Sequence, residues 1–99
     1  MTGGGAVHAG CNVESVSYGL TVCAERNAAA MVLANPDDRK IRLISILSPD
    51  ATACIPCGAC RQVLHEFGCE EVITLEASDT FRRYPFGTLL PYAFGSENL

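Results

Sequence analysis

The pattern of apolar and polar positions predicts two helices in the middle of this chain. The first covers residues 22–34, where alanine and other good helix formers dominate, and Asn35-Pro36 would end it. Thr21 would cap its N-terminus. The second helix covers residues 57–67, with its apolar residues on one side and Gly68 just after its end.

Short apolar runs predict the strands. Residues 43–47 (LISIL) are apolar and β-branched, which is typical of a buried strand, and residues 71–76 (EVITLE) form a second such run. Because a loop at 49–56 and a helix separate them, we expect the two strands to lie parallel in one βαβ unit. We expect residues 80–84 to form an edge strand and residues 7–13 to form a short strand.

Length and composition place these elements in one small α/β domain, with helices packed on a small sheet. The chain has 99 residues, 48% of them hydrophobic and 18% charged, which is typical of a globular fold rather than of disorder. Residues 1–6 (MTGGGA) are expected to form a flexible leader and residues 7–99 the folded domain. The run at 89–94 (LLPYAF) is too hydrophobic to remain exposed.

Charge and hydropathy narrow the classes of partner. The formal net charge is -4 and no cluster of Lys and Arg offers a track for phosphates, so nucleic acid is not an expected partner. No apolar run approaches the roughly 18–20 residues that a membrane-spanning helix needs. The start of the chain lacks the basic and apolar regions of a signal peptide, so we expect a cytoplasmic protein.

Three of the six cysteines, Cys54, Cys57 and Cys60, recur at three-residue intervals. In a reducing compartment such clustering favours metal binding or chemistry over disulfides. Residues three apart on a helix share a face, so Cys57 and Cys60 can converge on one ion. Cys23 begins the other helix, and helix N-termini favour thiolates. If the two helix starts meet, Cys23 supplies the third ligand of a zinc site.

Three protein ligands leave the fourth position of zinc open, which is typical of a catalytic site. Glu25, two residues after Cys23, can take a proton from water at that position and later deliver it to a substrate. Three thiolates outweigh the charge of one zinc ion, so a nearby cation is expected to offset them. Arg26 is the first candidate for that cation and Arg61 is the second.

Other uses of the cysteines stay open at this point. A fourth thiolate from Cys54 or Cys11 would close the site and make it purely structural. An iron–sulfur cluster fits the three-cysteine run but lacks the usual fourth cysteine. A thioredoxin-like redox pair leaves the third cysteine unexplained. Cys11, Cys54 and Cys69 are otherwise expected to be small buried hydrophobic residues, and His8 and His65 to be ordinary packed or surface histidines.

Three blocks of residues resemble the motifs of cytidine deaminases. They are Gly10-Cys-Asn-Val-Glu14, Cys23-Ala-Glu-Arg-Asn-Ala28 and Pro56-Cys-Gly-Ala-Cys-Arg-Gln-Val63. Zinc deaminases carry H-x-E followed by P-C-x-x-C, with an all-cysteine variant, and a cysteine in the first position resembles the small homotetrameric class. The resemblance runs from about residue 7 to residue 94. It implies α, β and α layers around a small mixed sheet, with zinc as the cofactor.

The resemblance also implies roles for individual residues. The ligands of one zinc ion would be Cys23, Cys57 and Cys60. The proton carrier would be Glu25, and the cation that offsets the thiolates would be Arg26. The substrate contacts would be Asn12, Glu14, Ala24 and Phe94, the last reaching a neighbouring subunit. Independently of the family, Asn12 and Glu14 lie two apart on an extended segment and therefore point the same way.

One segment of the family pattern is missing. Family members carry a helix and then an apolar strand before the Gly-Cys-Asn-Val-Glu block, whereas this sequence has MTGGG near that place. That strand would lie between the strand with Asn12 and the strand at 43–47, so the resemblance implies an N-terminally truncated fold with unpaired sheet edges. Either the chain is a fragment, or other chains complete the sheet, or the sheet is rearranged.

The function implied is zinc-dependent hydrolysis of cytidine or deoxycytidine to uridine or deoxyuridine and ammonia, a step of pyrimidine salvage. The implied partners are a small nucleoside substrate and further copies of the chain, in a homotetramer. Two alternatives stay open. One is deamination of a cytosine-nucleoside antibiotic, and the other is a catalytically incompetent deaminase fragment stabilised by zinc.

Overall fold

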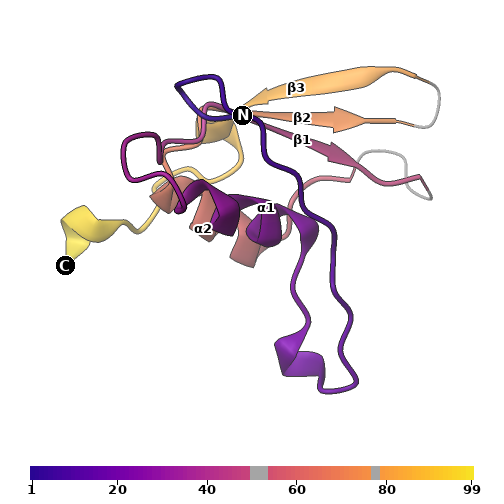
Figure 1. Ribbon diagram of the computed structural model, residues 1–99. Helices are drawn as coiled ribbons and strands as arrows, with labels where there is room; N and C mark the ends of the chain where they lie inside the picture. Colours follow the sequence, from indigo (N-terminus) through magenta and orange to yellow (C-terminus); the bar gives the residue numbers. More distant parts are fainter. Residues whose placement is uncertain (50–53, 77–78) are drawn as a thin grey trace.

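A computed structural model describes residues 1–49, 54–76 and 79–99 and shows a small sheet with two helices beneath it (Figure 1). The strands are β1 (Leu43–Leu47), β2 (Glu71–Leu75) and β3 (Phe81–Pro85). The helices are α1 (Ala24–Val32) and α2 (Gly58–Glu66), and both cover the same face of the sheet. Short 3-10 helices are found at Tyr18–Leu20, Phe86–Thr88 and Ser96–Asn98.

The sheet has the order β1-β2-β3 and is mixed. β1 and β2 run parallel, with α2 between them in the chain, and β3 pairs antiparallel with β2. The α/β class, the βαβ unit and the position of β1 are therefore confirmed. The loop predicted at 49–56 falls partly on residues 50–53, outside the described residues.

The core lies between the sheet and the helices. Alternate residues of β1 point into it, so that Ile44 and Ile46 are buried while Ser45 and Leu47 are exposed. Each fully buried aliphatic side chain contributes about 1.5–3 kcal/mol relative to exposure. The buried core residues are Ala29, Val32, Ile41, Ile44, Ile46, Leu64, Cys69, Val72, Phe86 and Leu89.

The predicted helix ends differ slightly from those observed. Cys23, not Thr21, is the N-cap of α1, because Thr21 lies in the preceding short turn with an extended backbone. Gly68 follows the end of α2 with a φ of 68°, a left-handed conformation that glycine adopts without strain. Residues 7–13 form no strand and make only one isolated bridge, between Val13 and Val22.

The Gly-rich start differs from the flexible leader expected from its glycines. Thr2 is buried, and it pairs with Ile41 in an antiparallel bridge just before β1. Its hydroxyl donates a hydrogen bond to the Asp38 carboxylate, and the Met1 amine donates to the carbonyl of Leu43 at 2.7 Å. These contacts arise from residues distant in sequence, so local composition does not reveal them.

The apolar run at 89–94 is only partly covered, so the prediction that it is not exposed is wrong for this single chain. Leu89 is buried, whereas Tyr92 is fully exposed and Phe94 is 57% exposed. The chain turns at Tyr92 with a φ of 53°, which directs the ring away from the core. No helix among the described residues is long and apolar enough to cross a membrane.

Candidate metal centre

The N-termini of α1 and α2 bring three cysteines together. Cys23 and Cys57 are the N-caps of the two helices, and Cys60 lies in the first turn of α2. The sulfur of Cys57 lies 3.9 Å from that of Cys23 and 3.4 Å from that of Cys60, and all three lie within 4.8 Å of one another. Tetrahedral zinc with Zn–S bonds of about 2.3 Å places its sulfur ligands about 3.8 Å apart. The three thiols therefore fit a zinc ion, and the predicted convergence is confirmed.

The environment of the thiols favours a cation. The backbone N–H of Cys60 is the main cause that lowers the pKa of Cys57. Cys60 is fully buried, and burial raises its pKa to about 12. A buried thiolate of this kind forms readily only beside a positive charge such as a metal ion.

Arg26 supplies a positive charge beside the thiols. Its guanidinium Nη2 lies 3.8 Å from the sulfur of Cys23, and hydrogen bonding to Cys23 and then Cys60 raises the pKa of Arg26. Arg61, the other candidate, donates instead to the carbonyls of Pro56 at 2.9 Å and Leu89 at 2.8 Å. Arg61 thus joins the start of α2 to the C-terminal segment, while Arg26 faces the thiols.

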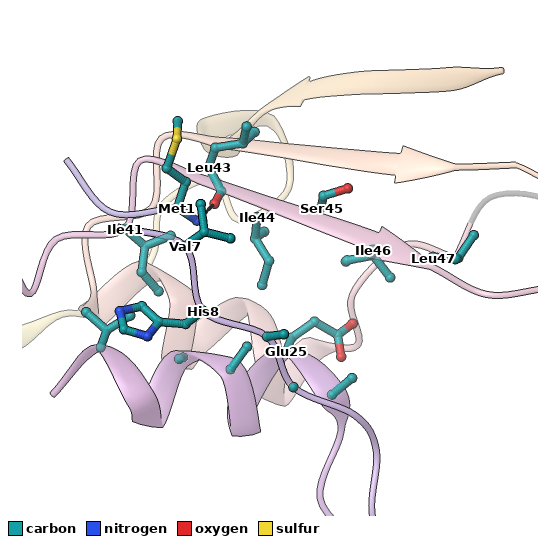
Figure 2. Close-up of a pocket in the computed structure, with 16 residues that line it drawn as sticks. Met1, Val7, His8, Glu25, Ile41, Leu43, Ile44, Ser45, Ile46 and Leu47 are labelled. Carbon is teal, nitrogen blue, oxygen red and sulfur yellow. Dashed lines mark hydrogen bonds between the residues drawn. The ribbon is translucent and has the colours of Figure 1, made fainter. Parts of the chain in front are cut away.

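Glu25 lies in the first turn of α1, directly beside the cysteines. It is only 9% exposed, and its charge contributes to the raised pKa of Cys60. Among the described residues, none forms a hydrogen bond or ion pair with its carboxylate. Figure 2 shows this side chain between α1 and β1, at one end of a cavity of about 490 Å3. The side chain is therefore largely buried, and its carboxylate is free to exchange a proton with a molecule bound in the cavity.

The fourth-thiolate alternative gains no support from the geometry. Within the described residues, the cluster of candidate metal ligands contains neither Cys11 nor Cys54. Cys11 is exposed, which corrects the expectation of a buried residue, and Cys54 is half-buried. A site with three thiols and an adjacent carboxylate leaves one zinc position for water or substrate.

The two histidines lie apart from the thiol cluster. His8 lines the cavity at the opposite end from the Glu25 carboxylate (Figure 2). His65 stacks on Phe86 with ring centroids 6.4 Å apart. Neither histidine belongs to the ligand cluster in the described part of the chain.

The residues predicted to contact substrate lie on three different segments. The Asn12 amide donates to the Glu14 carboxylate at 3.1 Å, so these two exposed side chains do point the same way. Ala24 is half-buried and lines the cavity. The ring of Phe94 is exposed, while its carbonyl accepts a hydrogen bond from Gln62 at 2.9 Å. Substrate contact by these residues stays a prediction.

Two residues without a predicted role, Gly10 and Asn27, hold the Asn12 segment on α1. The Asn27 amide donates to the carbonyl of Cys11 at 2.8 Å. Gly10 lies so close to α1 that an added Cβ would be 2.5 Å from the backbone nitrogen of Ala28. Both lie within the motif blocks, which is the only signal that could have identified them. They position Asn12 and Glu14 on the helix that carries Cys23 and Glu25.

Comparisons with known proteins agree with this geometry. Residues 1–76 match the family described as the cytidine and deoxycytidylate deaminase zinc-binding region. A cytidine deaminase from Mycobacterium tuberculosis is 43% identical over 97 residues, which cover 96% of this chain and 68% of the relative. A cytidine deaminase from Sporosarcina psychrophila is 33% identical, over 96% of this chain and 71% of the relative.

Solved structures show the same relationship. The crystal structure of cytidine deaminase from Burkholderia pseudomallei has a TM-score of 0.78 at 38% identity, over 95% of this chain and 76% of that one. The crystal structure of cytidine deaminase from Mycobacterium tuberculosis has a TM-score of 0.76 at 37% identity, over 95% of this chain and 73% of that one. With its three thiols and adjacent glutamate, the chain belongs to the cytidine and deoxycytidylate deaminase family of zinc-binding proteins.

Proposed function

We propose that this chain is a zinc-dependent deaminase that converts cytidine or deoxycytidine and water to uridine or deoxyuridine and ammonia. The observation that carries the proposal is the meeting of three thiols and one buried carboxylate, which has no partner among the described residues, at the N-termini of two helices. The relatives, which are cytidine deaminases, supply the substrate class. A purely structural zinc site has no use for the carboxylate of Glu25.

The residues present divide the chemistry between metal binding and proton transfer. Cys23, Cys57 and Cys60 would hold the zinc ion, which when bound polarises a water molecule for attack on the pyrimidine. Glu25 would accept a proton from the attacking water and deliver it to N3 of the ring. It would then take the remaining proton from the hydroxyl group added at C4 and pass it to the departing amino group, so that ammonia leaves and C4 keeps the oxygen as a carbonyl. Burial of Glu25 keeps bulk water from competing for these protons.

Asn12 and Glu14 are proposed to bind the sugar of the nucleoside. Asn12 and Glu14 offer one amide and one carboxylate on the same side of an extended backbone, a suitable set for sugar hydroxyls. This pair favours an ordinary nucleoside over a cytosine-nucleoside antibiotic. Ala24 and, from a neighbouring subunit, Phe94 complete the proposed contacts. We also propose that the chain forms a homotetramer, is located in the cytoplasm and acts in pyrimidine salvage.

Binding of a hydrated-pyrimidine nucleoside analogue separates a catalytic site from a zinc-stabilised remnant. Because such an analogue resembles the tetrahedral intermediate, a catalytic site is expected to bind it at least about 100-fold more tightly than cytidine. Calorimetry with the zinc-loaded protein measures both affinities. Equal affinity for the two ligands, or no binding of the analogue, would favour the remnant.

Removal of the Arg26 charge is expected to slow turnover while zinc stays bound. Uncompensated thiolates make the ion a poorer Lewis acid, and loss of such a supporting partner costs about 10–100-fold in activity. The measurement is kcat of Arg26→Gln together with its zinc content. Arg39→Gln, which removes an exposed charge, is the matched control and should retain the wild-type kcat. An unchanged kcat for Arg26→Gln would refute its role.

Gly10→Ala is expected to displace the segment that carries Asn12 and Glu14. Since the added Cβ would meet the backbone of Ala28 at 2.5 Å, the segment must move away from α1. We expect kcat/KM for cytidine to fall at least about 10-fold, because misplacing a binding group by about an ångström costs up to 100-fold. Gly19→Ala, at a position with open space around it, should leave kcat/KM unchanged. Equal kinetics for the two variants would show that this close approach has no part in substrate binding.

A further inference from the structure

The C-terminal segment, residues 89–94, is fastened to α2 by two neighbouring side chains of that helix. Arg61 donates to the carbonyl of Leu89 at 2.8 Å, and Gln62 donates to the carbonyl of Phe94 at 2.9 Å. Among the described residues, none forms a backbone hydrogen bond with the stretch between these two points, and none except Gln62 forms a hydrogen bond with Phe94. The position of Phe94 along α2 therefore depends on Gln62.

The amide of Gln62 is held in one orientation. Its nitrogen also lies 3.3 Å from the Glu66 carboxylate, one helical turn further along α2. A carboxylate only accepts hydrogen bonds, so the NH2 group of Gln62 is directed toward both Glu66 and Phe94. The same helix has Cys57 as its N-cap and carries Cys60 in its first turn. The thiol cluster and Phe94 are thus attached to one helix.

The ring of Phe94 takes no part in the cavity beside Glu25 of its own chain. Among the described residues, none after Leu47 lines that cavity. The ring is 57% exposed, and Figure 1 shows the C-terminal end of the chain projecting from the body that the sheet and helices form. A contact between this ring and a substrate therefore requires a second copy of the chain.

We propose that Gln62 is a positioning residue that holds Phe94 where its ring contacts the substrate bound in a neighbouring subunit. This inference rests on the proposed function, in which Phe94 makes that contact. Gln62 acts through the backbone of Phe94 and does not itself touch the substrate. One helix, α2, thereby holds the metal ligands Cys57 and Cys60 of its own subunit and positions a substrate contact for the next.

Gln62→Met removes the donor but keeps the length and the helix propensity of the side chain. Because the ring contacts the bound substrate and takes no part in proton transfer, we expect KM for cytidine to rise at least about tenfold while kcat stays within about twofold. Gln62→Lys has a donor of similar reach and should restore the wild-type KM. Circular dichroism and zinc analysis check that both variants keep their fold and metal. Equal KM values for Gln62→Met and the wild type would overturn the role of Gln62.

Mixed assemblies test whether Gln62 acts on the neighbouring site. Differently tagged Gln62→Met and Glu25→Gln chains are produced together and purified on both tags, so that Glu25 is intact only in the Gln62→Met chains. Some of these sites receive Phe94 from a Glu25→Gln chain, so kcat/KM per intact Glu25 should rise at least about threefold over that of Gln62→Met alone. The control adds Phe94→Ala to the Glu25→Gln chain and should show no rise. No rise in the first assembly, or an equal rise in the control, would overturn the proposal.

A readout without turnover separates this inference from the proposed function. The NMR order parameter of the Phe94 backbone N–H is expected to be about 0.85 in the wild type and below about 0.6 in Gln62→Met, with recovery in Gln62→Lys. An active wild type with equal order parameters in the three proteins would overturn only this inference. An inactive wild type with the expected change would overturn the proposed function instead.

Discussion

Glu25→Gln is expected to abolish deamination while the protein keeps its fold and its zinc. Glutamine has nearly the same shape as glutamate but cannot carry the proton between water, ring and leaving group. General acid–base groups contribute about 10²–10⁴-fold, and Glu25 would serve in two transfers, so kcat should fall at least about 10³-fold. The measurement is the rate of uridine formation from cytidine, with zinc content determined on the same sample.

Glu66→Gln is the matched control for this variant. Glu66 lies on the exposed side of α2, where its carboxylate accepts a hydrogen bond from Gln62 at 3.3 Å. Its replacement removes the same charge without touching the thiol cluster, and kcat should stay within about twofold of the wild type, as surface substitutions rarely exceed 0.5 kcal/mol. A Glu25→Gln variant that retains more than a tenth of the wild-type kcat would exclude Glu25 as the proton carrier.

Cys60→Ser is expected to lose the zinc ion and much of the stability of the fold. Cys60 is fully buried at the junction of α1 and α2, so the metal joins the two helices that cover the sheet. Because metal binding and folding are coupled in small domains, we expect a loss of about 3 kcal/mol or more, which lowers Tm by roughly 12–24 °C. Differential scanning calorimetry and metal analysis give the two quantities.

The controls separate loss of the metal from loss of packing. Cys11→Ser changes an exposed cysteine outside the cluster and should leave both zinc content and Tm unchanged. A chelator should lower the Tm of the wild type but not that of Cys60→Ser, which has no zinc to lose. Full zinc content in Cys60→Ser, or a further drop of its Tm with chelator, would contradict the assignment of Cys60 as a ligand.

The parts of the fold that follow from local sequence were predicted well. The run LISIL has no polar interruption except Ser45, and β1 has the bounds expected from it. Cys57 and Cys60 could be placed together because residues three apart on a helix share a face, whereas Cys23 joins them only because the starts of α1 and α2 meet. Glu25 followed from its position beside Cys23 in the same turn.

The features that depend on distant contacts were not predicted. Residues 7–13 have a suitable composition for a strand, but a strand needs a partner along its length, and this segment has only the bridge at Val13. The burial of Thr2 comes from pairing with Ile41, far along the chain. Asn27 could not be distinguished from an ordinary surface residue of α1, because its bond to Cys11 depends on where the preceding segment lies.

Product formation from cytidine by the zinc-loaded wild-type chain tests the central claim most directly. Uridine is followed by chromatography and ammonia by a coupled assay, in the same reaction. We expect equal amounts of the two products, formed in proportion to the protein and lost when a chelator removes the metal. A folded, zinc-loaded protein that releases neither product above the uncatalysed rate would contradict the proposal that this chain is a cytidine deaminase.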